Sequence, residues 1–295
     1  MLWTPENFHI ELTDICSAQC PFCLRSKSWV TLWNNQLFIE DITKFFDDCV
    51  LKNLTSVYLC WNLWDPIYAK DFLLIVEFFV SHNIDITIST NGFNNKKLFW
   101  EKLGSMWVTV VFWIDGISQK THSSYRVWTD LKQVLKNAKN FIDAWGIWVW
   151  QFIVFKNNEH QIDIARKTAK KMWFSDFLLK TSREYSQNLP QPKYKIPKQW
   201  GSITSTFECK YRKNKRFYIS SCWYILPCCF LWDAQFSNTL LQDKKMNIKG
   251  FSFEDIQKNA VWEKEIWNFH YWNWTNACSL NCWKTQIRPK EYIKL

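Results

Sequence analysis

The chain has 295 residues and 11 cysteines, is 47% hydrophobic and carries a formal net charge of +10, which allows a large core in one main domain with a smaller one beside it. Its longest apolar run, 72–80, contains Glu77 and is too short to cross a bilayer, so no membrane association is expected. The first ten residues show no basic start or apolar stretch, and an odd cysteine count in a long chain without an export signal favours a cytoplasmic protein with metal-bound thiolates over disulfides.

Short apolar runs alternate with amphipathic stretches along the first part of the chain, which predicts strand–helix units around a parallel sheet. We expect six strands, at 7–12, 55–60, 84–89, 107–114, 147–155 and 175–180. The five intervening helices are expected at 37–52, 69–82, 94–103, 130–144 and 158–172. This α/β pattern predicts a partial (β/α)6 TIM-like barrel, in which functional side chains follow the carboxyl ends of the strands.

The loop after the first predicted strand carries three cysteines. Cys16, Cys20 and Cys23 are spaced C-x3-C-x2-C. Iron–sulfur clusters with four irons normally take four cysteines, so three thiolates from one loop would leave an iron open to a small molecule. A zinc site or buried free thiols are the alternatives, although zinc ligands usually come as two such pairs and no second close pair follows within the next hundred residues.

This spacing, together with the aromatic Phe22 before the last cysteine, resembles the signature of the radical S-adenosylmethionine (radical SAM) enzymes. The resemblance implies that a 4Fe–4S cluster on Cys16, Cys20 and Cys23 binds S-adenosylmethionine (SAM) at its open iron, with Phe22 beside the cofactor. It also implies an electron donor of the flavodoxin or ferredoxin type, and a 5′-deoxyadenosyl radical that abstracts a substrate hydrogen. The core of such an enzyme would span 1–185.

The loops after the second and third predicted strands carry further resemblances. With glycine at 61 and 64, the segment 61–66 would read G-N-L-G-D-P, which is similar to the Gly-Gly-Glu-Pro segment that offers backbone groups to the SAM amino group in this family. That similarity assigns Trp64 and Asp65 to the cofactor site. Thr90 and Asn91 begin a T-N-G sequence that looks like the one near the cofactor ribose in relatives. A strand-to-helix turn and a tight Asn-Gly turn are the alternatives.

Asp115 follows the fourth predicted strand, and Arg126 comes after it in a D-G…H-x-x-Y-R pattern that is frequent in this superfamily. There the resemblance implies that Asp115 and Arg126 belong to the cofactor site, with the arginine meeting the SAM carboxylate. A guanidinium group can bind a carboxylate through two parallel hydrogen bonds. A surface arginine on a helix is the alternative, and the sequence assigns no catalytic acid or base.

The tryptophan and glycine counts are unusual. Trp occurs 21 times and Gly only 6 times, whereas ordinary composition would give about 20 glycines in a chain of this length. Several tryptophans stand at turns or helix ends, where glycine is the usual residue: Trp61, Trp64, Trp145 and Trp173. We hypothesise that many of these codons are UGA, read as glycine in the source organism. A truly tryptophan-rich chain is the alternative, and Trp100 and Trp150 are expected to be genuine.

The C-terminal part differs from the barrel region. Three prolines among polar residues predict a linker at 186–204, and 205–295 lacks the strand–helix rhythm. There, Cys209-x13-Trp223-x4-Cys228 matches the C-x9–15-G-x4-C hairpin of the SPASM and twitch extensions of radical SAM enzymes, if residue 223 is glycine. The hairpin would lie at 216–226.

Cys278 and Cys282 would complete four ligands, with Cys209 and Cys228, for an auxiliary 4Fe–4S cluster. Four ligands resemble the shorter, one-cluster twitch form. The neighbouring Cys222 and Cys229 look non-ligating, and the x3 spacing of the last pair departs from the usual C-x2-C. A zinc ribbon built from the same four cysteines is the alternative.

The sequence therefore predicts a radical SAM oxidoreductase or maturase that oxidises or cross-links a peptide or protein. The peptide follows only from the substrates common among relatives with such extensions, and a small molecule such as a sugar is the alternative. A tRNA-modifying radical SAM enzyme, or a non-catalytic zinc or iron–sulfur module that binds nucleic acid, would be a different outcome. The densest basic stretch, 210–216, is expected to be a solvated loop, so nucleic acid is not the favoured partner.

Overall fold

The computed structural model describes residues 4–27, 34–60, 64–93, 96–196, 214–226, 228–231, 244–258 and 290–294. Within these residues, nine strands form one sheet in the order β8-β7-β1-β2-β3-β4-β5-β6-β9. Its centre is six parallel strands in chain order: β1 (Asn7–Ile10), β2 (Ser56–Leu59), β3 (Asp85–Thr90), β4 (Thr109–Trp113), β5 (Ile147–Val154) and β6 (Asp176–Thr181). The six predicted strands and the partial barrel are confirmed.

Strands from the C-terminal region extend this sheet at both edges. The predicted hairpin is present as β7 (Arg216–Ile219) and β8 (Ile225–Leu226), which pair antiparallel. The sequence did not predict that β7 lies parallel to β1, nor that β9 (Lys290–Lys294) pairs antiparallel with β6. Parts of the predicted second module therefore belong to the same sheet as the barrel.

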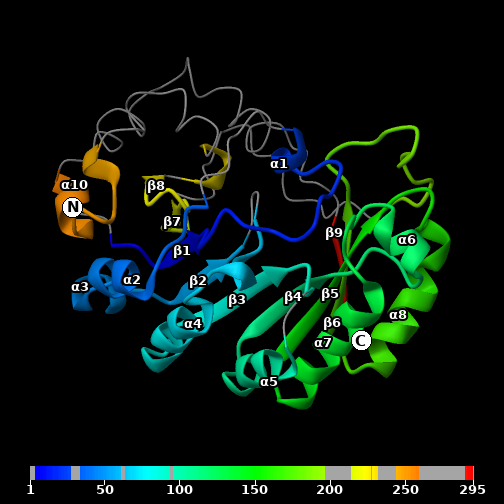
Figure 1. The fold of residues 1–295 in the computed structure, drawn as a ribbon, viewed down its shortest axis with the longest axis horizontal. Coiled ribbons are helices and arrows are strands. Elements are labelled where there is room, and N and C mark those ends of the chain that lie inside the picture. Colours follow the sequence, from blue (N-terminus) through cyan, green and yellow to red (C-terminus); the bar gives the residue numbers. More distant parts are fainter. Residues whose placement is uncertain are drawn as a thin grey trace.

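Helices cover the outer, convex side of the curved sheet (Figure 1). The longer ones are α2 (Ile39–Phe45), α4 (Phe72–Ser81), α5 (Lys97–Ser105), α7 (Leu131–Asp143) and α8 (Ile162–Lys171). Shorter helical segments are α1 (Leu24–Lys27), α3 (Asp48–Leu51), η1 (Pro66–Tyr68), α6 (Gln119–Ser123), η2 (Glu159–Gln161), η3 (Cys229–Leu231), η5 (Lys244–Met246) and α10 (Phe253–Lys258). None of the described helices is both long and apolar enough to span a membrane.

One predicted helix, 37–52, is divided in two. The Asp47 carboxylate accepts a hydrogen bond from the Val50 backbone N–H at 3.1 Å and caps the start of α3. An N-cap residue has an extended backbone, so α2 must end before it. Cys49, which continues the expected apolar face of one long helix, is exposed, and α3 buries Val50 instead.

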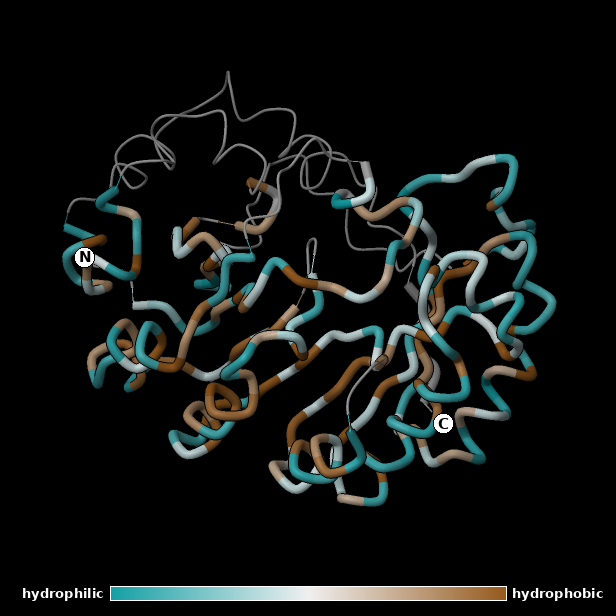
Figure 2. The backbone as a smooth tube through the Cα atoms, in the orientation of Figure 1, coloured by the Kyte–Doolittle hydropathy of each residue, from teal (hydrophilic) through white to brown (hydrophobic). Residues whose placement is uncertain are grey.

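The two faces of the sheet differ in character. Outward-facing residues such as Phe8, Phe112 and Phe152 are fully buried against the helices, and each buried aromatic side chain stabilises the fold by about 1.5–3 kcal/mol. In Figure 2 the strands are mostly brown, whereas loops and outer helix sides are largely teal. Residues of alternate register are polar but also buried, among them His9 and Gln151. The concave side of the sheet is therefore lined for polar contacts.

Among the described residues, five tryptophans have the left-handed backbone that normally belongs to glycine. Their φ angles are 58° at Trp107, 68° at Trp128, 70° at Trp145, 66° at Trp173 and 67° at Trp223. A left-handed backbone costs a residue with a Cβ atom roughly 1–2 kcal/mol, and a bulky side chain there is a genuine outlier. Glycine adopts the same angles without this cost.

Three of these tryptophans follow the ends of α5, α7 and α8, at the position where glycine commonly ends a helix. Their side chains are 72% exposed at Trp107, 76% at Trp145 and 78% at Trp173. By contrast, Trp100 and Trp150 are fully buried, and the Trp150 indole Nε1 donates to the Ile114 carbonyl at 2.8 Å. These observations support the glycine hypothesis at the positive-φ positions and genuine tryptophan at the two core positions.

Candidate functional site

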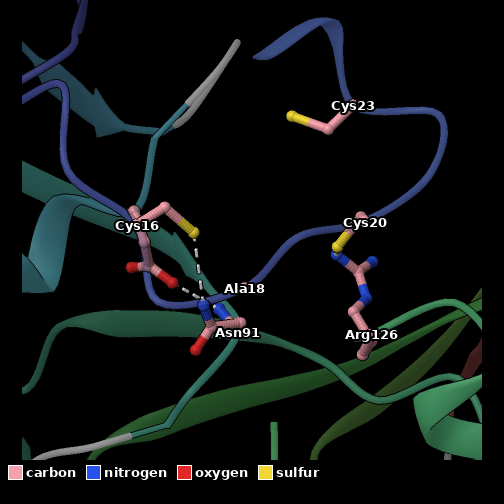
Figure 3. A pocket seen from close by; sticks show the side chains of 7 residues that line it. Cys16, Ala18, Cys20, Cys23, Asn91 and Arg126 are labelled. Carbon is pink, nitrogen blue, oxygen red and sulfur yellow. Dashed lines mark hydrogen bonds between the residues drawn. The ribbon is translucent and has the colours of Figure 1, made fainter. Parts of the chain in front are cut away.

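The loop after β1 brings three thiols to one pocket. Cys16, Cys20 and Cys23 line it together with Ala18, Asp65, Asn91 and Arg126, and Figure 3 shows the three sulfur atoms around the central space. Among the residues that the structure describes, no three His, Cys, Asp or Glu side chains converge on one metal-ion position. The three cysteines thus lie at one pocket, as the sequence predicts, and their thiols surround its space instead of converging on a single point.

Hydrogen bonds to three backbone carbonyls hold this cysteine loop. The Gln19 N–H donates to the Val127 carbonyl at 3.0 Å, and the Asp65 N–H donates to the Ile15 carbonyl at 3.1 Å. Arg25, in α1, donates from Nη1 to the Cys16 carbonyl at 3.0 Å. The loop is thus fixed to the segments that follow β2 and β4, which themselves contribute residues to the pocket.

Asp65 connects the loops after β2 and β3. Its Oδ2 atom accepts from the Thr90 hydroxyl at 2.9 Å and from the Asn91 N–H at 2.7 Å, and its Oδ1 accepts from the Ile67 N–H at 3.4 Å. Burial raises the pKa of Asp65 to about 6, against the opposing effect of these hydrogen bonds. Three residues predicted for the cofactor site, Asp65, Thr90 and Asn91, therefore form one connected unit.

Asn91 presents its side-chain amide to the cysteine loop. Its Nδ2 lies 3.6 Å from the Cys16 sulfur and 3.5 Å from the Ser17 hydroxyl. The Tyr68 hydroxyl bonds to Ser17 Oγ at 2.6 Å and donates to the Phe93 carbonyl at 2.7 Å. The sequence analysis did not identify Ser17 or Tyr68, because their contacts join segments far apart in the chain and neither belongs to a motif.

Arg126 is buried at the pocket and not on the surface, so the alternative of a surface arginine is wrong. Its Nε donates to Asp115 Oδ2 at 2.6 Å, and its Nη1 lies 3.6 Å from the Cys20 sulfur. Both members of the ion pair are at most 1% exposed. Burial opposes the charged guanidinium, but Asp115 and Cys20 outweigh it and raise the pKa of Arg126. A permanent positive charge therefore lies beside one of the three cysteines.

The thiols suit a group that carries positive metal ions. Burial raises the pKa of Cys16, Cys20 and Cys23 above the usual value, with Arg126 opposing this at Cys20 and Arg25 opposing it at the other two. Coordinated metal deprotonates a thiol outright, which would offset the cost of burial. Three buried thiols spaced around one pocket fit an iron–sulfur cluster of the kind the sequence predicted.

The other predicted cofactor residues do not line the pocket. Phe22 packs against Tyr125 and Phe155, with ring centroids 6.0 and 6.3 Å away. Trp64 is buried below the Arg25 guanidinium, which lies 5.6 Å from its ring centroid, and it does not have a positive φ. Thr90 and Asp115 act from behind the pocket, through Asp65 and Arg126.

The predicted auxiliary cluster stays a prediction. Cys209, Cys278 and Cys282 lie outside the described residues, as does Trp61, and Cys228 is buried just before η3. Burial raises the pKa of Cys222 to about 11, and its sulfur accepts from the Asn35 amide at 3.4 Å. The φ of Trp223, in the hairpin turn, agrees with the glycine that the motif requires there.

Comparisons with known proteins agree with this site. The family model described as the radical SAM superfamily matches residues 10–166. No curated protein matches the chain. Among solved structures, SuiB of Streptococcus suis bound to S-adenosylmethionine is similar with a TM-score of 0.71 and 16% identity, over 95% of this chain and 71% of that chain.

Two further structures share the fold. The anSMEcpe structure with bound AdoMet has a TM-score of 0.59 and 16% identity, over 85% of this chain and 77% of that chain. BtrN in complex with AdoMet and 2-DOIA has a TM-score of 0.52 and 12% identity, over 90% of this chain and 86% of that chain. At these identities the likeness shows the fold alone, but the family model covers more than half of the chain. This chain belongs to the radical SAM superfamily, a family of enzymes that work with a 4Fe–4S cluster and SAM.

Proposed function

We propose that Cys16, Cys20 and Cys23 hold the 4Fe–4S cluster at which SAM is cleaved, and that the enzyme oxidises or cross-links a peptide or protein. The observation that carries the proposal is the convergence of these three thiols with Asn91 and Arg126 on one pocket. When bound, the cluster and SAM would supply a 5′-deoxyadenosyl radical that abstracts a substrate hydrogen.

The residues of the pocket have distinct roles in this proposal. The three cysteines hold the iron, and the Asn91 amide and the Arg126 guanidinium offer donors to the amino-acid part of SAM. Asp65 holds Asn91 in place through the 2.7 Å bond to its backbone. Asp115 holds Arg126 in place through the 2.6 Å bond that it accepts from the side-chain Nε. A preorganised set of donors binds a ligand at a lower entropic cost than mobile side chains do.

Two observations support a peptide substrate. SuiB has also been solved with its precursor peptide SuiA, and that structure resembles this chain with a TM-score of 0.68 and 17% identity. The anSMEcpe structure with AdoMet and the Cp18Cys peptide has a TM-score of 0.57 and 16% identity.

An auxiliary cluster on Cys209, Cys228, Cys278 and Cys282 would make the outcome oxidative. Held by these four cysteines, the cluster would supply an acceptor for one of the electrons that the substrate loses in an oxidation. A donor of the flavodoxin or ferredoxin type would supply the electron needed for SAM cleavage. Support comes from the hairpin at 216–226, with Cys228 two residues beyond β8.

The test is SAM cleavage by the anaerobically reconstituted chain. Protein loaded with iron and sulfide receives dithionite and SAM, and 5′-deoxyadenosine is quantified by chromatography. The wild-type chain is expected to form it, whereas Cys20→Ala should reduce the yield at least 100-fold, on the order of the loss of an essential group. Cys49→Ala removes an exposed cysteine on α3 and should behave like wild type. An iron-loaded wild-type chain that forms no 5′-deoxyadenosine would contradict the proposal.

The substrate class is tested in the same assay. Candidate peptides encoded next to the gene, and bulk tRNA, are added separately, and 5′-deoxyadenosine formation is compared with the reaction without substrate. A mass loss of two hydrogens, or a cross-link, in a peptide supports the proposal. Modification of tRNA instead would replace the peptide with RNA while leaving the SAM chemistry in place.

A further inference from the structure

Arg126 is joined to the cysteine loop by a contact that reaches a sulfur atom. It follows α6, whereas Cys20 is in the loop after β1, and the two are 106 positions apart in the sequence. The guanidinium Nη1 lies 3.6 Å from the Cys20 sulfur, and Figure 3 shows the two side chains end to end. The Asn91 amide, which lies near the Cys16 sulfur, is uncharged, whereas Arg126 brings a full positive charge to Cys20.

The position of this charge is fixed from both sides. Asp115, which holds Arg126 Nε at 2.6 Å, accepts the Ile153 N–H of β5 on its other oxygen at 2.6 Å. The Asn158 amide donates to the Asp115 backbone carbonyl at 2.9 Å. On the other side, Val127 next to Arg126 accepts the Gln19 N–H at 3.0 Å, next to Cys20. These contacts with β5, the segment after β4 and the cysteine loop therefore fix the guanidinium relative to the sulfur.

A buried charge at this distance must act on a metal cluster bound to Cys20. One-electron reduction adds a negative charge to the cluster, and hydrogen bonds to the cluster sulfurs together with local charge set its potential. The interaction is strong because solvent does not screen it at a site that is at most 1% exposed. The Asp115 carboxylate is negatively charged and is separated from the sulfur by the Arg126 guanidinium. It must therefore act on the reduction potential in the opposite direction.

We infer that Arg126 raises the reduction potential of the SAM-binding cluster through Cys20, and that Asp115 limits this effect while positioning the guanidinium. The inference rests on the proposed ligand set of Cys16, Cys20 and Cys23. It is independent of any contact between Arg126 and SAM, so it is measured without SAM. Arg126 acts here through its charge, which makes the cluster easier for a protein donor to reduce, and Asp115 is the positioning residue.

The experiment is a reductive titration of the reconstituted full chain, followed by electron paramagnetic resonance at fixed solution potentials. The signal that disappears in Cys20→Ala identifies the SAM-binding cluster. At a fixed potential, Arg126→Gln should lower the ratio of reduced to oxidised cluster about tenfold, which corresponds to about 59 mV for a one-electron couple. Arg126→Lys keeps a positive charge and should lie between the two. Asp115→Asn should raise the ratio.

The control variant is Lys139→Gln, which removes a positive charge from an exposed pair with Asp143 and should leave the ratio unchanged. Iron content is measured for every variant, so that ratios are compared only per assembled cluster. An unchanged potential in Arg126→Gln overturns the inference. A shift of the potential in the same direction in Arg126→Gln and Asp115→Asn also overturns it. Removal of opposite charges must shift the potential in opposite directions. A wild-type chain that binds no iron overturns the ligand set and this inference with it.

Discussion

The Asp65 carboxylate accepts the backbone N–H of Asn91 at 2.7 Å, and this bond ties the loop after β2 to the loop after β3. The Thr90 hydroxyl donates to the same oxygen at 2.9 Å. Asn91 in turn directs its amide toward Cys16. A carboxylate that contributes no ligand to the cysteine pocket thus decides how a neighbouring side chain faces it.

Asp65→Ala is expected to lower both stability and SAM affinity. It leaves the buried donors of Thr90 and Asn91 without their acceptor, at about 1–3 kcal/mol for each group. We expect the free energy of unfolding to fall by about 2–6 kcal/mol on that basis, and the Kd for SAM to rise at least tenfold. Denaturant unfolding and calorimetric SAM titration measure the two effects.

Asp130→Ala is the matched control for this change. Asp130 also accepts a backbone N–H, from Gln133 at 2.7 Å, and caps α7 away from the pocket. Its loss should cost about 1 kcal/mol and leave SAM affinity unchanged. SAM binding by Asp65→Ala that equals wild type would show that Asn91 is oriented by something other than Asp65.

Cys228→Ser is expected to remove the auxiliary cluster. A chain with two 4Fe–4S clusters holds about eight irons, so loss of one leaves about four. Cys222→Ser changes a cysteine whose sulfur already accepts from Asn35, and it should retain the full iron content. Iron and sulfide analysis of the reconstituted proteins measures the difference. If Cys222→Ser loses iron and Cys228→Ser does not, the hairpin motif has been assigned to the wrong cysteine.

Stability is expected to fall as the pH drops below about 6.5, in part because of His122. Burial, and then the nearby Arg126, lower the pKa of His122 to about 3, and its Nδ1 accepts the Asp115 N–H at 3.3 Å. The neutral ring is therefore favoured in the folded state. Above the unfolded-state pKa of about 6.5 this stabilisation is complete, and it is lost as the unfolded chain takes up a proton between pH 6.5 and 3.

The slope in that window approaches about 1.4 kcal/mol per pH unit for each such histidine. His9, whose pKa burial also lowers to about 3, contributes in the same direction. His122→Gln should lower stability at pH 7 and make its pH dependence shallower. The same change at His160, which is exposed on η2, should leave the slope unchanged. Unfolding midpoints in denaturant between pH 5 and 7.5 measure the slopes.

The sequence predicted the parts of this molecule that depend on local periodicity and spacing. The strand expected at 84–89 is β3 at Asp85–Thr90, and the helix expected at 130–144 is α7 at Leu131–Asp143. Alternation within a strand and a 3.6-residue repeat within a helix are properties of neighbouring residues. The C-x3-C-x2-C spacing likewise placed Cys16, Cys20 and Cys23 at one pocket, because all three belong to one short loop.

The remaining features depend on contacts between distant segments. The approach of Arg126 to Cys20 follows from the curvature of the sheet, since β1 and β4 are not neighbouring strands. The pairing of β7 with β1 was also not predictable, because the four residues of Arg216–Ile219 would fit the edge of almost any sheet. Local sequence carries the type of an element more clearly than the identity of its partner.

Trp145→Gly and Trp173→Gly are each expected to stabilise the chain. Both positions have φ near 70°, where relief of the left-handed strain gains about 1–2 kcal/mol. Trp107, Trp145 and Trp173 precede the neighbouring strands β4, β5 and β6, so their exposed indoles lie at the amino ends of these strands, an arrangement that promotes association. Trp150→Gly is the control, and loss of its buried indole should cost at least about 3–5 kcal/mol. Thermal unfolding measures the stability of the three variants. The intact mass of the protein from its own source decides whether these codons are read as glycine or as tryptophan. A native mass that requires 21 tryptophans would end the glycine hypothesis.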